Sequence, residues 1–213
     1  MSEQRVRVKI CGITCPEDAR AAAVAGADAI GLVFHEPSSR YVEPLAAARI
    51  VAAVPPFVTT VGLFLNAPES TVRAVLKAVP LDLLQFHGSE DAAYCEGFGR
   101  PYIKAVAMGG NSDGLTAAVC EAYVGARGFL VDSHAPDEAG GSGRRFDWQT
   151  LRQRPEQPLI LAGGLHPGNV AEAVREVRPW AVDVSSGVES APGNKDAALM
   201  QRFVNEVRSG NSL

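Results

Sequence analysis

Short runs of apolar, mostly β-branched residues recur along the chain and predict eight strands. Continuous apolar runs of this length are typical of strands that are buried on both faces of a sheet. The predicted strands cover residues 6–10, 29–34, 59–65, 83–87, 102–108, 128–132, 159–164 and 181–186.

The segments between these runs carry apolar residues at spacings of three and four, which predicts amphipathic helices. The clearest of them cover residues 16–27, 44–54, 69–79 and 168–177. Several begin with proline, serine or an acidic residue and end at glycine or proline, as helices commonly do. Strands that alternate with helices in this way predict a parallel sheet covered by helices.

Eight strand–helix units in 213 residues average about 27 residues each, close to the usual βα repeat. We therefore expect an α/β fold, a (β/α)8 TIM barrel that forms a single domain over residues 1–213. Its reaction site is expected at the C-terminal ends of the strands. An open, doubly wound sheet is the alternative, although no GxGxxG motif follows the first strand. The helix expected at 147–154 is short, and the long irregular segment 133–146 before it suggests a functional loop.

Composition and charge narrow the classes of function. A net charge of −4 and a pI near 5.6 argue against binding to nucleic acid or to an anionic membrane. No apolar stretch reaches the roughly 20 residues of a membrane span, and the first ten residues lack a signal-peptide core. We therefore expect a cytoplasmic protein. The four cysteines show no zinc-like clustering, and disulfides are not expected in that compartment.

Polar residues at the predicted strand ends are candidates for acid–base chemistry. Cys11 ends the first strand and Asp132 the sixth, so the two can face one another across a small ligand. A thiolate is a competent base and a carboxylic acid a competent proton donor. Lys9 shares a strand face with Cys11 and would favour the thiolate. Taken alone, Cys11 is more typical of a buried core residue, and Asp132 could be a helix cap or a loop carboxylate.

Glycine and serine follow the last two predicted strands, a pattern that suggests phosphate binding. Glycine lets a phosphate approach the backbone, and a short helix after the eighth strand can direct N–H groups at an anion. The glycine-rich part of the long loop could add donors or act as a hinge. The phosphate-binding candidates are Gly141, Gly143, Gly163, Gly164, Ser185 and Gly187. The alternative is that these glycines only make tight turns.

Other charged residues at or near the strand ends allow two interpretations each. Arg40 could bind a ligand or be a solvated surface charge. His87 could bind a ligand or be a hydrogen-bonded structural residue. Asp183 could touch a ligand or pair with an inward lysine. Lys9 and Lys104 are set back within their strands, where structural charge in a polar barrel core is expected.

Several motifs occur in an order that extends over nearly the whole chain. They are KICGIT, RYV, QFHGSE, LVDS, GGSGRRFDW, LAGGL and DVSSGVE followed by PGNKD. Any one of them is weak evidence, but their ordered combination closely resembles the phosphoribosylanthranilate isomerases.

The resemblance implies an Amadori rearrangement in tryptophan biosynthesis, without a metal or an organic cofactor. It implies that Asp132 is the general acid that opens the furanose ring and Cys11 the general base that removes the C2 proton. It places Arg40 at the anthranilate carboxylate and Asp183 near the anthranilate nitrogen, and we assign His87 to substrate binding. The implied partner is a small phosphorylated substrate, with no nucleic acid or membrane, and a monomer or homodimer is expected.

Rival functions remain at this level. A Schiff-base aldolase would need a reactive lysine at a strand end, and a metal-dependent epimerase would need converging ligands. A non-catalytic sugar-phosphate sensor should lack one member of the acid–base pair. The segment 66–70 (NAPES) lacks the glycines of a second phosphate site, so we expect a single substrate.

Overall fold

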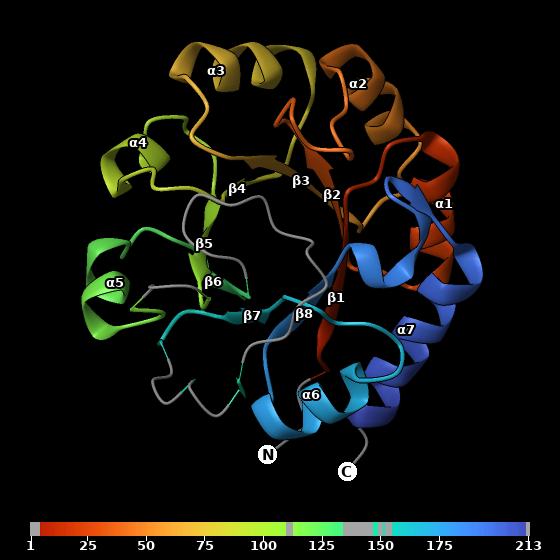
Figure 1. Cartoon of the computed structure of the whole chain (residues 1–213). Helices are drawn as coiled ribbons and strands as arrows, with labels where there is room; N and C mark the ends of the chain where they lie inside the picture. Colours follow the sequence, from red (N-terminus) through yellow and green to blue (C-terminus); the bar gives the residue numbers. More distant parts are fainter. Residues whose placement is uncertain (1–4, 110–112, 134–146, 149–150, 152–154, 212–213) are drawn as a thin grey trace.

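The eight predicted strands close into one parallel barrel in the computed structural model (Figure 1). The structure describes residues 5–109, 113–133, 147–148, 151 and 155–211. The strands are β1 (Arg7–Cys11), β2 (Ala29–Val33), β3 (Thr59–Phe64), β4 (Leu83–Phe86), β5 (Tyr102–Ala107), β6 (Phe129–Asp132), β7 (Leu159–Leu161) and β8 (Ala181–Val184). The predicted (β/α)8 barrel is confirmed, and the open sheet is excluded because β1 pairs with β8.

Helices surround the barrel (Figure 1). They are α1 (Pro16–Ala25), α2 (Pro44–Ala52), α3 (Glu69–Ala78), α4 (Ala92–Glu96), α5 (Ala117–Ala122), α6 (Val170–Val177) and α7 (Ala197–Gly210). The sequence signals act as expected in α1, which begins with Pro16 and ends at Gly26 in a left-handed conformation. Most of the predicted helix 147–154, and the loop after Ser133, lie outside the described residues. No helix in the described ranges is long and apolar enough to cross a membrane.

The chain between β8 and α7 forms a short helical turn and two short strands, and the sequence pattern did not predict the strands. A single 3-10 turn, η2 (Ser186–Val188), follows β8 and confirms the expected short helix. Next come β9 (Glu189–Ala191) and β10 (Asn194–Lys195), which pair antiparallel in a hairpin outside the barrel. The hairpin lies on the β1–α1 loop, where the Thr14 hydroxyl donates to the carbonyl of Gly193. This position brings Glu189 and Lys195 to the rim of the barrel.

Apolar side chains fill two regions, one between the sheet and the helices and a smaller one inside the barrel. The outer region contains fully buried rings such as Phe64 and Phe86, which pack with neighbouring aromatic side chains. The inner cluster consists of Ile103, Ala105, Leu130 and Ala162. Every second residue of each strand points into the barrel, and these side chains fill its interior. Space for a ligand is therefore expected only at the C-terminal rim.

A valine on the helix face that packs against the sheet should contribute more to stability than a valine on the face exposed to solvent. Replacing Val72, fully buried on α3, with alanine should lower the free energy of unfolding by about 2 kcal/mol, since two methyl groups leave a cavity. The matched change Val24→Ala, at an α1 position that is 84% exposed, should alter it by less than about 0.5 kcal/mol. Urea unfolding of both variants checks the pair, and equal losses would contradict the assigned core.

Candidate active site

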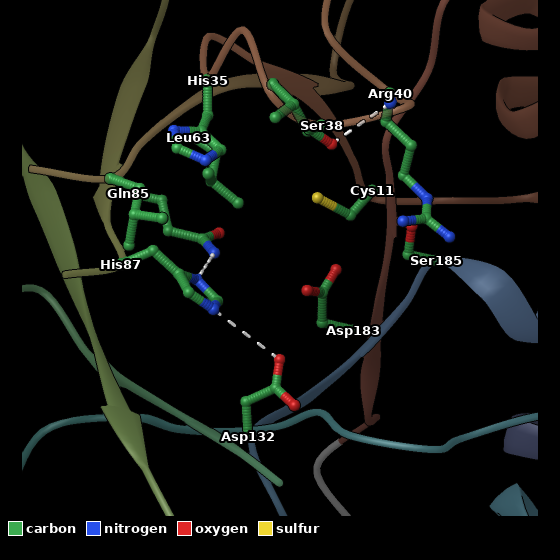
Figure 2. Close-up of a pocket in the computed structure, with 12 residues that line it drawn as sticks. Cys11, His35, Ser38, Arg40, Leu63, Gln85, His87, Asp132, Asp183 and Ser185 are labelled. Atoms are coloured by element: carbon green, nitrogen blue, oxygen red, sulfur yellow. Dashed lines mark hydrogen bonds and ion pairs between the residues drawn. The ribbon is translucent and has the colours of Figure 1, made fainter. Parts of the chain in front are cut away.

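A pocket with an empty volume of about 520 Å³ opens at the C-terminal ends of the strands. Six of the residues singled out from the sequence line it, namely Cys11, Arg40, His87, Asp132, Asp183 and Ser185. In Figure 2, Cys11, Asp132 and Asp183 point into the same space from different strands, and His87 faces them from the β4 side. Closure of the barrel therefore brings together residues that are far apart in the sequence.

Cys11 is the last residue of β1 and is buried, with 5% of the residue exposed. Room for the sulfur depends on Gly31 of β2, because a β-carbon there would lie 2.7 Å from Cys11 Sγ. Burial raises the pKa of Cys11, and the charge of Lys9 opposes that shift only in part. Lys9 therefore lowers the pKa of Cys11, as expected, but the effect of burial on that pKa is larger.

Lys9 and Asp183 form a buried ion pair directly below the pocket. Lys9 Nζ lies 2.8 Å from Asp183 Oδ1, and the two residues are register partners on β1 and β8. Burial by itself would lower the pKa of Lys9, but the neighbouring Asp183 and Cys11 raise it to about 12. The lysine is therefore protonated, and the alternative in which Asp183 pairs with an inward lysine is confirmed.

Asp132, His87 and Gln85 form a row across one side of the pocket (Figure 2). His87 Nε2 lies 3.8 Å from Asp132 Oδ2, and His87 Nδ1 lies 3.0 Å from Gln85 Nε2. When the Gln85 amide donates to Nδ1, the imidazole carries its proton on Nε2, toward Asp132. Gly163 leaves space for this strand end, since a β-carbon there would lie 2.9 Å from Asp132 Oδ1.

Arg40 reaches the pocket from the β2–α2 loop and is held by the hairpin. Its Nε and Nη2 each lie 2.8 Å from a carboxylate oxygen of Glu189, whose Oε1 also accepts from Lys195 Nζ at 2.7 Å. Burial would raise the pKa of Glu189, but these hydrogen bonds and charges lower it, so the carboxylate is ionised. Gly12, at φ +76°, lets the arginine pass, because a β-carbon there would lie 2.5 Å from Arg40 Cδ.

Lys104 lies away from the pocket, contrary to the expectation of a charge inside the barrel. It shares the outer face of β5 with Tyr102 and Val106, which belong to the core between sheet and helices. Its Nζ lies 2.9 Å from Glu90 Oε2, and Glu90 also accepts from the backbone N–H of Gly88. The pair stabilises the loop that carries His87.

The phosphate-binding candidates fall into three groups. Ser185 lines the pocket, whereas Gly141 and Gly143 lie outside the described residues. Gly163, Gly164 and Gly187 lie in the loops after β7 and β8, which pack tightly: a β-carbon on Gly187 would lie 2.0 Å from the carbonyl oxygen of Leu165. Packing therefore requires a glycine at position 187, whether or not these loops bind phosphate.

Sequence reasoning did not select Gln85, Glu189 or Lys195 as site residues, although all three occur in the motifs QFHGSE and DVSSGVE…PGNKD. His35, Ser38 and Leu63 also line the pocket. The hydrophobic pattern of the sequence does not mark such residues, because some lie in loops and the others face the pocket only through the register of the barrel strands. In the described part of the chain, no three His, Cys, Asp or Glu side chains are grouped so that they could hold a metal ion.

A (β/α)8 barrel with a pocket of ionisable and apolar side chains at the C-terminal rim defines a class of barrel proteins to which many metabolic enzymes belong. Within that class, the family described as N-(5'phosphoribosyl)anthranilate (PRA) isomerase matches residues 8–206. The N-(5'-phosphoribosyl)anthranilate isomerase of Acidithiobacillus ferrooxidans is 58% identical over 203 residues, which are 95% of this chain and 98% of the relative. The chain therefore belongs to the phosphoribosylanthranilate isomerase family, as the motifs predicted.

Solved structures agree with this assignment. The phosphoribosyl anthranilate isomerase of Thermotoga maritima has a TM-score of 0.83 and 41% identity, covering 95% of this chain and 98% of its own. Another structure of the family, with a TM-score of 0.78, 38% identity and the same coverage of both chains, holds reduced 1-(o-carboxyphenylamino)-1-deoxyribulose 5-phosphate. A further Thermotoga maritima structure, at a TM-score of 0.78 and 36% identity, is described as derived from a dimeric protein.

The raised pKa of Cys11 predicts how the thiol responds to pH. Its alkylation by iodoacetamide should speed up with pH and show no plateau below about pH 8.5, because only the thiolate reacts. Peptide mapping by mass spectrometry isolates Cys11 from the other cysteines. A plateau reached near neutral pH would contradict the effect of burial, since it would place the thiol pKa below its ordinary value.

Proposed function

We propose that this protein catalyses the Amadori rearrangement of N-(5'-phosphoribosyl)anthranilate to 1-(2-carboxyphenylamino)-1-deoxyribulose 5-phosphate, a step of tryptophan biosynthesis. The observation that carries the proposal is the placement of Cys11 and Asp132 at the ends of β1 and β6, pointing into one pocket (Figure 2). Family membership over residues 8–206 supports the choice of substrate.

Asp132 is the proposed general acid. Protonated, it gives its proton to the ring oxygen of the ribose, and the C1–O bond breaks as the anthranilate nitrogen forms a C=N bond to C1. His87 lies on the side of Asp132 Oδ2 and orients the carboxyl group. A positioned acid of this kind contributes roughly 10²–10⁴ in rate.

Cys11 is the proposed general base. The iminium ion formed in the first step acidifies the neighbouring C2–H bond, so the thiolate of Cys11 can remove that proton. The electron pair forms a C1=C2 bond, and the resulting enolamine takes a proton at C1 as its C2 hydroxyl becomes the ketone.

The rest of the pocket binds and orients the substrate in this proposal. Arg40 binds the anthranilate carboxylate, for which a planar guanidinium is well suited. Asp183 pairs with Lys9 and lines the pocket, and we assign it to accept from the anthranilate N–H. In its present orientation, the buried amide oxygen of Gln85 has no partner among the described residues, which makes it an acceptor for a ribose hydroxyl.

The substrate phosphate is assigned to the loops after β7 and β8. The backbone N–H groups of Gly164, Ser186 and Gly187 have no backbone acceptor in the loops of the described residues, which supports their assignment to an anion. Gly163 and Ser185 flank these amides in the sequence, and Gly141 and Gly143 are assigned from the family motif alone.

The electrostatics of Lys9 and Lys104 argue against either of them as the reactive lysine of a Schiff-base aldolase. Such an enzyme needs a neutral lysine that faces the substrate. Lys9 is paired with Asp183 and has a pKa of about 12, and Lys104 is paired with Glu90 outside the barrel. Neither lysine is suited to attack a carbonyl carbon.

The remaining expectations belong to the same proposal. Residues 1–213 act as one barrel domain in the cytoplasm, use no cofactor and bind no nucleic acid. A homodimer is compatible with the relative from Thermotoga maritima that is described as dimeric. Loss of the fluorescence of freshly prepared N-(5'-phosphoribosyl)anthranilate on addition of the purified protein tests the activity. An unchanged signal, together with failure to rescue a tryptophan auxotroph that lacks this isomerase, would reject it.

Removal of either proposed acid–base group should stop most turnover without unfolding the protein. Cys11→Ala and Asp132→Asn should each lower kcat by about 10²–10⁴. Cys11→Ser should also be severely impaired, since a hydroxyl ionises far less than a thiol. Steady-state kinetics and thermal melts, measured together, separate chemistry from stability.

Cys15 offers a matched control four residues away. It precedes α1 without a side-chain capping hydrogen bond, so Cys15→Ala should retain near-normal kcat. If Cys11→Ala also kept near-normal kcat, Cys11 would be a packing residue and the mechanism would be wrong, even with the family assignment intact.

A further inference from the structure

Three charged side chains at the rim form a cluster with an excess of positive charge. Arg40, Glu189 and Lys195 are connected by hydrogen bonds of 2.7–2.8 Å, and their side chains are 13%, 4% and 0% exposed. Burial lowers the pKa of Lys195, and its hydrogen bond to Glu189 and the charge of that carboxylate oppose the shift. With the lysine protonated, two cations and one carboxylate leave a net charge of one positive unit. Since the cluster is largely shielded from water, this charge is screened weakly.

The pairing of Arg40 determines which of its donors a ligand can use. Glu189 occupies Nε and Nη2, the lateral edge of the guanidinium. No described residue accepts from Nη1, and in Figure 2 one terminal nitrogen is directed toward Cys11 and the pocket while the other is directed away. Because Glu189 holds Nε and Nη2, Nη1 is the nitrogen that no described residue engages, and it retains two N–H donors for a ligand.

Glu189 alone would cancel the attraction of Arg40 for an anion. A bidentate arginine–carboxylate pair is neutral overall, and a second carboxylate approaching it would meet the negative charge of Glu189. Lys195 removes this obstacle, because its ammonium group binds the same oxygen of Glu189 from the side of β10. Lys195 is fixed in turn by the backbone carbonyl of Ser185, 3.1 Å away.

The hairpin that carries Glu189 and Lys195 is anchored against the loop of Arg40. Gly193, at φ +83°, brings its backbone against Ser39, where a β-carbon would lie 2.8 Å from the carbonyl oxygen. The backbone N–H of Lys195 donates to Asp18 of α1. The hairpin that carries Glu189 and Lys195 is therefore held against the β2–α2 loop at Ser39 and against α1 at Asp18.

We propose that Lys195 is a specificity-determining residue: it neutralises Glu189 so that Arg40, held in place by Glu189, keeps one unit of charge for a single aryl carboxylate of the ligand. Glu189 and Lys195 touch no substrate atom and act through Arg40 as positioning residues. The inference rests on the proposed function for the identity of the ligand, and it adds the reason why an arginine already bound to a carboxylate can bind another.

Two ligands separate the charge effect from general damage to the pocket. One is reduced 1-(o-carboxyphenylamino)-1-deoxyribulose 5-phosphate, and the other is the same compound without the ring carboxylate. Titration calorimetry of Lys195→Met should show about a tenfold weaker affinity for the first ligand and less than about a twofold change for the second. The KM for the substrate should rise in parallel, with kcat changed far less.

A charge-compensated double variant provides the decisive comparison. Lys195→Met/Glu189→Gln again leaves Arg40 with one unit of positive charge, so affinity for the carboxylate ligand should return to within about threefold of the parent protein. Lys77→Met, which removes an exposed lysine of α3, controls for the net charge of the whole protein and should change neither affinity. Thermal melts verify that every variant is folded.

Two results would overturn the inference. An equal loss of affinity for both ligands in Lys195→Met would mean that the lysine supports the pocket rather than the charge on Arg40. A double variant as weak as the single one, while folded, would mean that charge balance is not what Lys195 contributes. If the parent protein binds neither ligand and has no isomerase activity, the proposed function itself fails, which is a distinguishable outcome.

Discussion

The ion pair between Lys9 and Asp183 lies across the seam where the first and last strands meet. The two residues are register partners, and their side chains join β1 to β8 at 2.8 Å inside the barrel. A shift of one residue along this seam would turn every side chain of β8 to the opposite face. Asp183 would then leave the pocket, and Ser185 and the hairpin would no longer lie beside Cys11 and Arg40. The geometry of the site thus depends on this register.

Buried charge recurs around the pocket, and each cation in the described rim has a carboxylate partner. Lys9 pairs with Asp183, Arg40 with Glu189, and Lys195 with Glu189 as well. Buried ion pairs contribute little net stability, because desolvation opposes the attraction, but loss of one partner leaves a costly isolated charge. These pairs are therefore best understood as fixing position and local potential, which is what a pocket for an anionic ligand requires.

The strands could be predicted from the sequence because buried parallel strands leave continuous apolar runs. The closed barrel followed from counting them, and Cys11 and Asp132 followed from the rule that strand ends face the site. The hairpin β9–β10 could not be predicted in this way, since its strands are two and three residues long and carry no apolar period. The prediction for Lys104 was wrong because Lys104 and Ile103 lie on opposite faces of β5, and the sequence alone does not say which face points into the barrel. The structure places Ile103 on the inner face.

The pKa values place a constraint on the order of the proposed steps. Burial raises the pKa of Cys11, so the resting thiol is protonated at neutral pH, and Lys9 is too closely paired with Asp183 to reverse this. Formation of the iminium ion adds a positive charge next to C2, close to where the base must act. A cation there favours the thiolate and acidifies the C2–H bond at the same time. The thiolate is thus populated, as its proton passes to solvent, only after the acid has opened the ring, which couples Asp132 to Cys11 through the charge on the ligand.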